Sequence, residues 1–385
     1  MSAILDKLLK GQKVEWLPLG EACEIADNLR KPVKSSLRVA GNIPYYGANN
    51  IQDYVEGYTH NGEYVLIAED GSANLENYSI QWATGKFWAN NHVHVVKGKE
   101  NLDSRFLYHF LRFMNFIPYL TGGDRAKLTK AKMVEIPIPI PPLDVQAEIV
   151  RILDAFTAVT AELTAELNMR EKQYQYYRDK LLSFSDVSIE TDSNRQQQTA
   201  LCERLTNNVK QNHQIIWKNL GEVVKIKNGK DWKNLGQGDI PVYGSGGIMN
   251  YVDKASYDKV SVLIPRKGTI TNIFYTEKPF WNVDTIFYTE IDESQIFPKF
   301  LFHFMKNFDL TTLSTDSTRP SLTQTTLNKI SIPLPSLNEQ KRISNILDKF
   351  ETLTHSITEG LPKEIALREQ QYEYYREQLL DFPKN

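Results

Sequence analysis

The chain has 385 residues, of which 41 % are hydrophobic and 24 % are charged, and its formal net charge at pH 7 is −2. This composition is ordinary for a globular protein of two or three domains, and there is no apolar run of the roughly 18 residues that a membrane span needs. Without a signal-peptide core or a CxxC spacing we expect a cytoplasmic protein, in which any nucleic-acid binding would need locally gathered basic residues or a basic partner.

Residues 1–11 predict a short helix that belongs with the far end of the chain. Residues 6–9 read DKLL, and the same letters recur at residues 179–182, near the end of a long helical stretch. After each copy come a short link and a W-x-x-L-G-E motif, which begins at Trp16 and at Trp217. This order is typical of a circularly closed repeat, so we expect residues 1–11 to pack beside the C-terminal helix.

Two segments, residues 12–141 and 216–335, predict one mixed α/β domain that is used twice. Residues 43–51 align with residues 240–248, and further motifs recur in the same order. Short runs rich in β-branched and aromatic residues alternate with Gly, Asn and Ser turns, which predicts a curved or barrel-like sheet. The letters between the matches differ, so we expect one scaffold with two different loop surfaces. The polar residues 185–215 are assigned to a linker.

Residues 142–184 and 336–385 predict two long helices. Apolar residues recur at steps of three and four, the pattern of a coiled-coil seam. The tandem TAEL at residues 160–167 adds a step of four, which unwinds a supercoil locally, and Gly360 and Pro362 predict a kink in the second helix. The expected fold class is therefore α+β, with two related domains separated by two long antiparallel coiled-coil helices in a pseudo-twofold circular repeat.

The chain carries no catalytic signature. It has no GxxxxGK[ST] phosphate loop, no GxGxxG after a strand, no HExxH and no GxSxG. His92 and His94 stand at positions i and i+2 of one strand and could face a metal ion, but no third ligand lies near them in the sequence. We therefore expect a non-catalytic chain with no metal and no cofactor of its own.

What remains is a recognition surface that the chain presents twice. Asn and Gln read adenine, Arg and Lys read guanine, and an acidic side chain accepts from cytosine. Glycine-flanked Asn and Ser are also common turn residues, so each candidate has a purely structural alternative. The candidate DNA contacts of the first segment are Tyr46, Asn49, Asn50, Asp70, Ser72, Asn74, Lys86, Asn90, Asn91, Arg125 and Lys127. Those of the second are Tyr243, Ser245, Arg266, Lys267, Thr269, Thr271, Asn272, Asn282, Asp284, Arg319 and Ser321.

Arg125 and Arg319 form an equivalent pair in polar loops before a strand. We expect phosphate contacts from this shared pair and base reading from the loops that differ. Trp88 and Trp281 also stand among polar loop residues, but the core is the expected place for such large rings.

The helical segments carry the most specific resemblance to a known family. The first contains QAEIVRILDAF and ends in REKQYQYYRDKLLSF, and the second contains NEQKRISNILDKF and REQQYEYYREQLLDF. With matches along nearly the whole chain, the sequence resembles the specificity subunit of type I restriction-modification systems, in the subgroup with the TAEL repeat. The resemblance implies that residues 12–141 and 216–335 are target-recognition domains, and that residues 142–184 and 336–385 are the conserved helical regions.

The resemblance also implies the partners. Double-stranded DNA would be bound, and two modification (methyltransferase) subunits would dock and bring S-adenosylmethionine and the catalytic residues. A restriction (translocase/nuclease) subunit could join them. The resemblance carries over neither a target sequence nor a methylated base, and residues 185–213 depart from the family's close pattern. The candidate partner contacts are Tyr174, Tyr176, Tyr177, Tyr372, Tyr374 and Tyr375.

Two different readers on one rod predict a bipartite asymmetric target, unlike the palindromes of symmetric dimers. One TAEL more or fewer would shift a helix by about 6 Å, which corresponds to one to two base pairs at about 3.4 Å each. The residues alone leave one alternative, a two-headed lectin-like interaction protein on a coiled-coil stalk. The missing secretion signal and the absence of stabilising disulfides disfavour it. A methyltransferase in its own right would need the motifs that the chain lacks.

Overall fold

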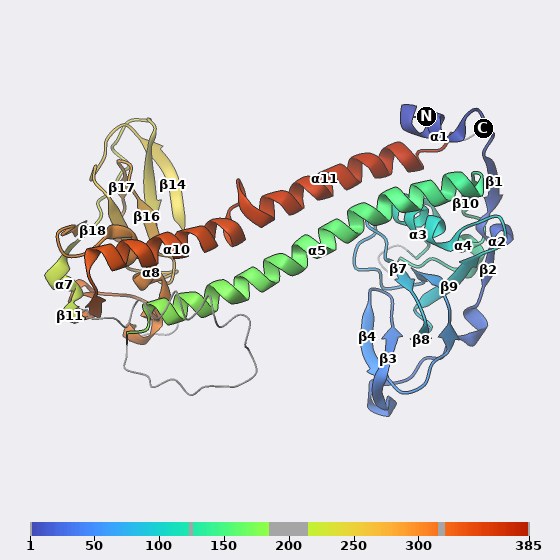
Figure 1. Ribbon diagram of the computed structural model, residues 1–385, viewed down its shortest axis with the longest axis horizontal. Coiled ribbons are helices and arrows are strands. Elements are labelled where there is room, and N and C mark those ends of the chain that lie inside the picture. Colours follow the sequence, from blue (N-terminus) through green and yellow to red (C-terminus); the bar gives the residue numbers. More distant parts are fainter. Residues whose placement is uncertain (1, 123–125, 185–214, 315–319, 384–385) are drawn as a thin grey trace. The chain divides into compact units, whose positions relative to one another are not determined.

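The computed structural model describes residues 2–122, 126–184, 215–314 and 320–383 (Figure 1). The chain divides into two compact units. The first unit comprises Met1–Thr164 with Glu364–Asn385, and the second comprises Ala165–Lys363. Arg125 and Arg319, and all of the predicted linker except residue 215, lie outside the described residues.

The first unit contains two four-stranded sheets and one strand pair. The first sheet is antiparallel and has the order β2-β9-β6-β7, and the second has the order β4-β3-β8-β5, in which β3 and β8 are parallel. The central strand β6 reads YVLIA and is almost wholly buried, as expected for a strand covered on both faces. The elements are β1 (Glu15–Pro18), α2 (Leu19–Ala22), β2 (Cys23–Ile25), β3 (Ala40–Tyr46), β4 (Ile51–Val55), β5 (His60–Asn61), β6 (Tyr64–Ala68), β7 (Ile80–Ala83), β8 (Lys86–Ala89), β9 (Val93–Gly98), α3 (Ser104–Phe113), α4 (Lys130–Met133) and β10 (Pro137–Ile140), which pairs with β1.

The second unit repeats this plan, which confirms the predicted duplication and the mixed α/β content. Its sheets have the orders β12-β18-β15-β16 and β14-β13-β17, and β13 and β17 are parallel. Among the described residues the sheets of each unit have linear strand orders, so of the expected curved or barrel-like sheet a closed barrel is not formed. The elements are β11 (Ile216–Asn219), α7 (Leu220–Val223), β12 (Val224–Lys227), β13 (Ile240–Gly244), β14 (Gly247–Val252), β15 (Ser261–Pro265), β16 (Phe274–Thr276), β17 (Trp281–Asn282), β18 (Ile286–Ile291), α8 (Pro298–Asn307), α9 (Gln324–Leu327) and β19 (Ser331–Leu334), which pairs with β11.

The two predicted long helices are present, and the units share them. The first is one uninterrupted helix, α5 (Leu143–Leu182), and the second is broken into α10 (Leu337–His355) and α11 (Gly360–Leu380). The break confirms the predicted kink: Gly360 has φ +78°, and a Cβ there would lie 2.4 Å from the Thr352 carbonyl oxygen. The helices run antiparallel, and equivalent aromatic contacts join them within each unit. Those contacts are Phe156–Tyr375, with ring centroids 5.1 Å apart, and Phe350–Tyr177, at 5.5 Å.

The N-terminal helix α1 (Ala3–Leu9) packs in one core with the end of α11, and the two elements lie close together in Figure 1. Ser2 caps α1 by accepting from the Leu5 N–H, and its hydroxyl donates to the Gln378 carbonyl. The buried side chains of Leu5 and Leu9 share one core with those of Leu379, Leu380 and Phe382. Burial of these apolar side chains holds the two ends of the chain in one unit.

A buried glutamine attaches each long helical segment to its globular part. In the first unit the Gln146 amide donates to the carbonyls of Asn101 and Pro141, at 2.9 and 2.7 Å, and its Oε1 accepts from the Asp103 N–H at 2.8 Å. Gln340 makes the three equivalent contacts in the second unit, and both side chains are fully buried. Loss of either amide would leave buried backbone groups unpaired.

A buried histidine forms a second attachment, and we expect it to make stability depend on pH. His109 Nε2 donates to Asp154 at 2.8 Å, and its Nδ1 has no partner among the described residues. Burial lowers the pKa of His109 to about 4, although Asp154 acts in the opposite direction. In the unfolded chain this imidazole binds a proton below about pH 6.5, whereas in the folded chain it stays neutral down to about pH 4. The contribution of neutral His109 to the free energy of unfolding is therefore fully present above about pH 6.5 and is lost as the pH falls towards 4.

The His109→Gln variant keeps an amide donor for Asp154 but removes this titration. Between pH 7 and pH 5 the wild type is expected to lose about 2 kcal/mol of unfolding free energy that the variant does not lose. Urea unfolding at the two pH values measures the difference. An equal loss in both proteins would contradict the assignment.

Candidate nucleic-acid interface

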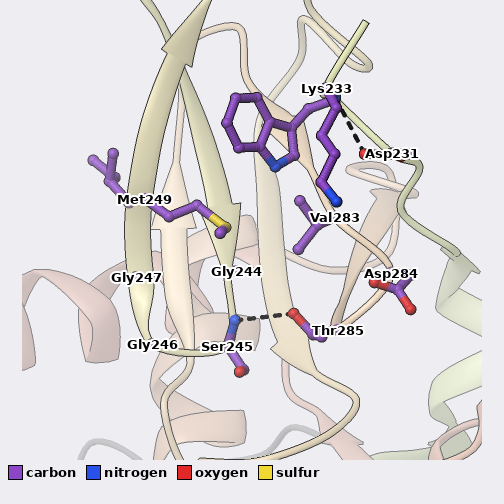
Figure 2. A pocket seen from close by; sticks show the side chains of 12 residues that line it. Asp231, Lys233, Gly244, Ser245, Gly246, Gly247, Met249, Val283, Asp284 and Thr285 are labelled. Atoms are coloured by element: carbon purple, nitrogen blue, oxygen red, sulfur yellow. Dashed lines mark hydrogen bonds between the residues drawn. The ribbon is translucent and has the colours of Figure 1, made fainter.

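A hollow with a volume of about 740 Å³ lies in the second unit (Figure 2). Its walls are residues 231–233, the turn between β13 and β14 at residues 244–249, and residues 283–285 after β17. Gly247 has φ +117°, a conformation that favours glycine, so the glycine-rich turn is needed for the chain to reverse here. The three walls come from separate parts of the sequence.

Backbone and side-chain hydrogen bonds hold the walls together. The Ser245 N–H donates to Thr285 Oγ1 at 3.4 Å, as drawn in Figure 2, and the Val283 N–H donates to the Tyr243 carbonyl at 3.0 Å. The indole N–H of Trp281 donates to the Lys230 carbonyl at 3.0 Å and so fixes the loop that carries residues 231–233. Trp88 makes the same contact to the Lys31 carbonyl, at 2.7 Å, so both rings position the backbone.

The hollow offers both polar and apolar contacts. Lys233 and Asp284 line it, and they provide a cationic donor and a carboxylate acceptor. Beside it, β14 turns apolar side chains outward: Met249 is 57 % and Tyr251 50 % exposed. An acceptor can pair with the cytosine amino group, a lysine with guanine or phosphate, and apolar groups with the thymine methyl. Sequence reasoning missed Lys233 and Met249, although an exposed apolar residue beside a Gly-Gly turn was a detectable signal.

The equivalent turn of the first unit is closed by its own side chains. The Asn49 amide donates to the Gly71 carbonyl at 2.7 Å and accepts from the Ala73 N–H at 2.8 Å. The Gln81 amide donates to the carbonyls of Gly47 and Ala48, at 2.9 and 3.1 Å. The same hairpin therefore presents a filled surface in one unit and a hollow in the other.

A cluster of ion pairs lies next to this turn in the first unit. Glu69 pairs with Arg30 at 2.8 Å and with Lys127 at 2.9 Å. The Asp27 carboxylate pairs with Arg30 at 3.3 Å, lies 2.7 Å from His94 Nδ1 and accepts from the Val95 N–H at 2.8 Å. Burial raises the pKa of both carboxyl groups, but their hydrogen bonds and charged neighbours outweigh burial and hold each pKa below its ordinary value. Both are therefore carboxylates at neutral pH.

Comparison with known proteins follows this geometry. The sequence profile described as the type I restriction modification DNA specificity domain matches residues 12–170 and 216–367. The chain belongs to this family. It is 50 % identical to a putative type I restriction enzyme specificity subunit of Haemophilus influenzae, over 98 % of each chain. It is 32 % identical to a type I restriction enzyme specificity subunit of Escherichia coli, over 99 % of this chain and 97 % of that one.

Solved structures agree with the fold of this family. The S subunit of the type I restriction-modification system from M. genitalium superposes with a TM-score of 0.67, at 17 % identity and 97 % coverage of each chain. A chain from a study of complex assembly in the type I R-M system gives a TM-score of 0.51, at 14 % identity, over 96 % of this chain and 98 % of that one. At such identities the likeness supports the fold alone, and the lectin-like alternative gains no support.

Three of the predicted DNA contacts are buried, so for them the prediction was wrong. Tyr46 packs edge-on against Phe87 inside the sheet. The carbonyl oxygen of the Asn90 side chain accepts from the His92 N–H at 2.8 Å. The Asn282 side chain accepts from the Ser256 hydroxyl and donates to the Ile286 carbonyl, both at 2.9 Å. The hydrogen bonds of the two buried asparagine side chains are thus made inside the protein.

Other candidates of the first unit lie at the surface but also shape turns. Asn50 and Asn74 accept from backbone N–H groups one to three residues later. Ser72 donates to the Asn74 carbonyl at 2.8 Å, and Asp70 lies 2.6 Å from His92 Nδ1. Lys86 lies over the Tyr58 ring, and Asn91 is exposed. Their role in DNA contact stays a prediction.

Five candidates of the second unit line two hollows, and the others lie elsewhere in the unit. Ser245 and Asp284 line the large hollow, while Arg266, Lys267 and Ser321 line a second, smaller hollow of about 300 Å³. Three further candidates follow β15, of which Thr269 and Thr271 are exposed and Asn272 donates to the Ser245 carbonyl at 3.4 Å. Tyr243 packs partly buried against Phe274 and Phe280.

The six candidate tyrosines on the helices divide by exposure. Tyr174 is buried, so it was wrongly proposed as a partner contact. Tyr177 stacks on Phe350 of α10, and Tyr375 stacks on Phe156 of α5. Tyr372 packs against the core of the first unit. The equivalent pair Tyr176 and Tyr374 is 49 % and 55 % exposed. Of the six candidates, these two have the largest exposed fractions.

In the described part of the chain, no group of three His, Cys, Asp or Glu side chains is placed to hold a metal ion. Of the helices described, none combines the length and the apolar character that crossing a membrane requires.

Proposed function

We propose that this chain is the DNA sequence-specificity subunit of a type I restriction-modification complex, and that it is itself non-catalytic. Each unit reads one half of a bipartite, asymmetric target. One observation carries the proposal: a single scaffold occurs twice, with different side chains at the same turn, in a member of the specificity-domain family. Two copies of one backbone with unlike surfaces bind two unlike half-sites.

The large hollow of the second unit is the proposed base-reading surface there. Asp284 and Lys233 supply an acceptor and a donor, and the apolar side chains of β14 suit sugar and methyl contacts. In the first unit the proposed surface is the polar loop around Asn50 and Asn74, whose remaining hydrogen-bonding capacity faces outward.

The proposed partners follow from the family. In this proposal DNA and two methyltransferase subunits form the complex, a restriction subunit can join it, and the complex acts in the cytoplasm. Two methyltransferase subunits dock on the helical segments near Tyr176 and Tyr374, and they supply S-adenosylmethionine and the catalytic residues. Because the chain has a net charge of −2, these subunits also supply phosphate contacts, so the isolated chain binds DNA weakly.

The test is sequencing of methylated bases in DNA from a host that expresses the chain with its methyltransferase subunits. A host with the methyltransferase subunits alone is the control. The expected result is a two-part asymmetric motif that occurs only when the chain is present. Absence of a new motif, together with no copurification of the methyltransferase, would refute the proposal.

A further inference from the structure

Both units contain the same backbone corner, where the end of β6 or β15 meets the segment before α4 or α9. In the first unit the Leu128 N–H donates to the Glu69 carbonyl at 2.7 Å, and in the second the Leu322 N–H donates to the Arg266 carbonyl at 2.8 Å. An isolated bridge pairs Asp70 with Lys127, and its counterpart pairs Lys267 with Ser321. The corners are therefore equivalent position by position.

The side chains at these positions have opposite charge. In the first unit Ile67 of β6 pairs with His94 of β9, and in the second unit Ile264 of β15 pairs with Phe287 of β18. Ile67 is therefore equivalent to Ile264, and His94 to Phe287. Glu69 and Asp70 of the first unit thus correspond to Arg266 and Lys267 of the second. The remaining equivalent positions are Asp27 and Asn228, His94 and Phe287, and Lys127 and Ser321. Two acidic residues on one backbone are replaced by two basic residues on the other.

The corner of the first unit is neutralised from within. Arg30 and Lys127 bind Glu69 from two sides, and Asp27 also binds Arg30. Each charge in this cluster therefore has a counter-ion inside the protein, which is what a partly buried charge requires. Such a cluster stabilises the fold and leaves little charge to attract DNA.

The corner of the second unit carries two cationic side chains, Arg266 and Lys267. Among the described residues neither of them lies within ion-pair distance of a carboxylate, unlike Arg30 and Lys127 of the first unit. The Arg266 guanidinium is half-buried, 5.9 Å from the Phe287 ring centre, which restrains it. Beside it lies the hollow of about 300 Å³, whose wall adds the polar side chains of Ser321, Thr323 and Gln324. A guanidinium beside an aromatic ring, an exposed ammonium and polar donors around an open space fit a phosphate group.

We infer that this corner of the second unit binds one phosphate of the DNA backbone beside its half-site, and that the first unit lacks the equivalent contact. The inference rests on the proposed function. The two units would therefore differ in their electrostatic attraction to DNA. Binding of the second half-site would depend on salt through Arg266 and Lys267, while the first unit would not use its corner for binding.

The test uses the complex of the chain with its methyltransferase subunits and a duplex that contains the target. The Arg266→Gln/Lys267→Gln double variant is compared with wild type, with Lys259→Gln as a control that removes one exposed lysine of the same unit. Dissociation constants are measured over a range of salt concentrations. Because one phosphate contact is lost, the slope of log K against log salt should become shallower by about one in the double variant, for target and non-target DNA alike.

Several outcomes would overturn the inference. A slope equal to that of Lys259→Gln would do so, provided that the double variant melts like wild type, and a change of the methylated motif at one base would make the corner a base reader. Inorganic phosphate, added at constant ionic strength, tests whether the ligand is free phosphate and not DNA. If it raises the melting temperature of wild type but not of the double variant, and the salt slope of DNA binding is unchanged by the substitutions, the corner binds free phosphate. If wild type itself yields no bipartite motif, the proposed function fails first.

Discussion

A chain that lacks one TAEL copy, residues 164–167, is expected to recognise the same two half-sites at a spacing shorter by one to two base pairs. These residues lie in the middle of α5, which runs without a break from the first unit into the second. Removing four helical residues shortens the helix by about 6 Å and leaves each globular core untouched. The seam survives, because Leu163 and Tyr174 then stand seven residues apart, which is one heptad.

Sequencing of methylated DNA gives both half-sites and the spacer in one experiment. The same-length variant Thr164→Ala is the matched control; it removes only the hydroxyl bond to the Thr160 carbonyl and should keep the wild-type spacer. An unchanged spacer in the deletion would show that α5 does not set the distance, and altered half-sites would show that the deletion disturbs the recognition surfaces.

The Leu5→Ala/Leu9→Ala variant is expected to lose much of the stability of the first unit. Both side chains are buried in the core that also contains Leu379, Leu380 and Phe382. Each truncation costs about 2–5 kcal/mol, because it leaves a cavity as well as removing apolar burial. The midpoint temperature at which the first unit unfolds should therefore fall by at least about 10 °C. Calorimetry is suitable, since two units can unfold in separate transitions.

Lys7→Ala is the matched control for this variant, because Lys7 is exposed on the same helix. It should melt within a few degrees of wild type, as surface substitutions usually do. Equal melting of the double variant and the control would mean that α1 does not contribute to the core of the first unit. A lower midpoint temperature only for the unfolding of the second unit would contradict the placement of α1 in the first unit.

The sequence alone determined those features that depend on local spacing or on comparison of one half with the other. Heptad steps predicted the long helices, and Gly360 with Pro362 predicted the break between α10 and α11. The repeat predicted two like scaffolds, because matching letters in the same order require the same backbone. The resemblance carried by the helical segments pointed to the family that the profile match then established.

Only the tertiary structure decided which polar side chains face solvent. Asn282 and Asp284 stand two residues apart in the sequence, yet Asn282 is buried by partners from two other segments and Asp284 lines the hollow. Likewise Glu69 and Arg266 occupy the same corner, and their different states depend on Arg30 and Lys127, which are distant in sequence. Burial and ion pairing are set by contacts between remote residues, and spacing in one sequence does not contain them.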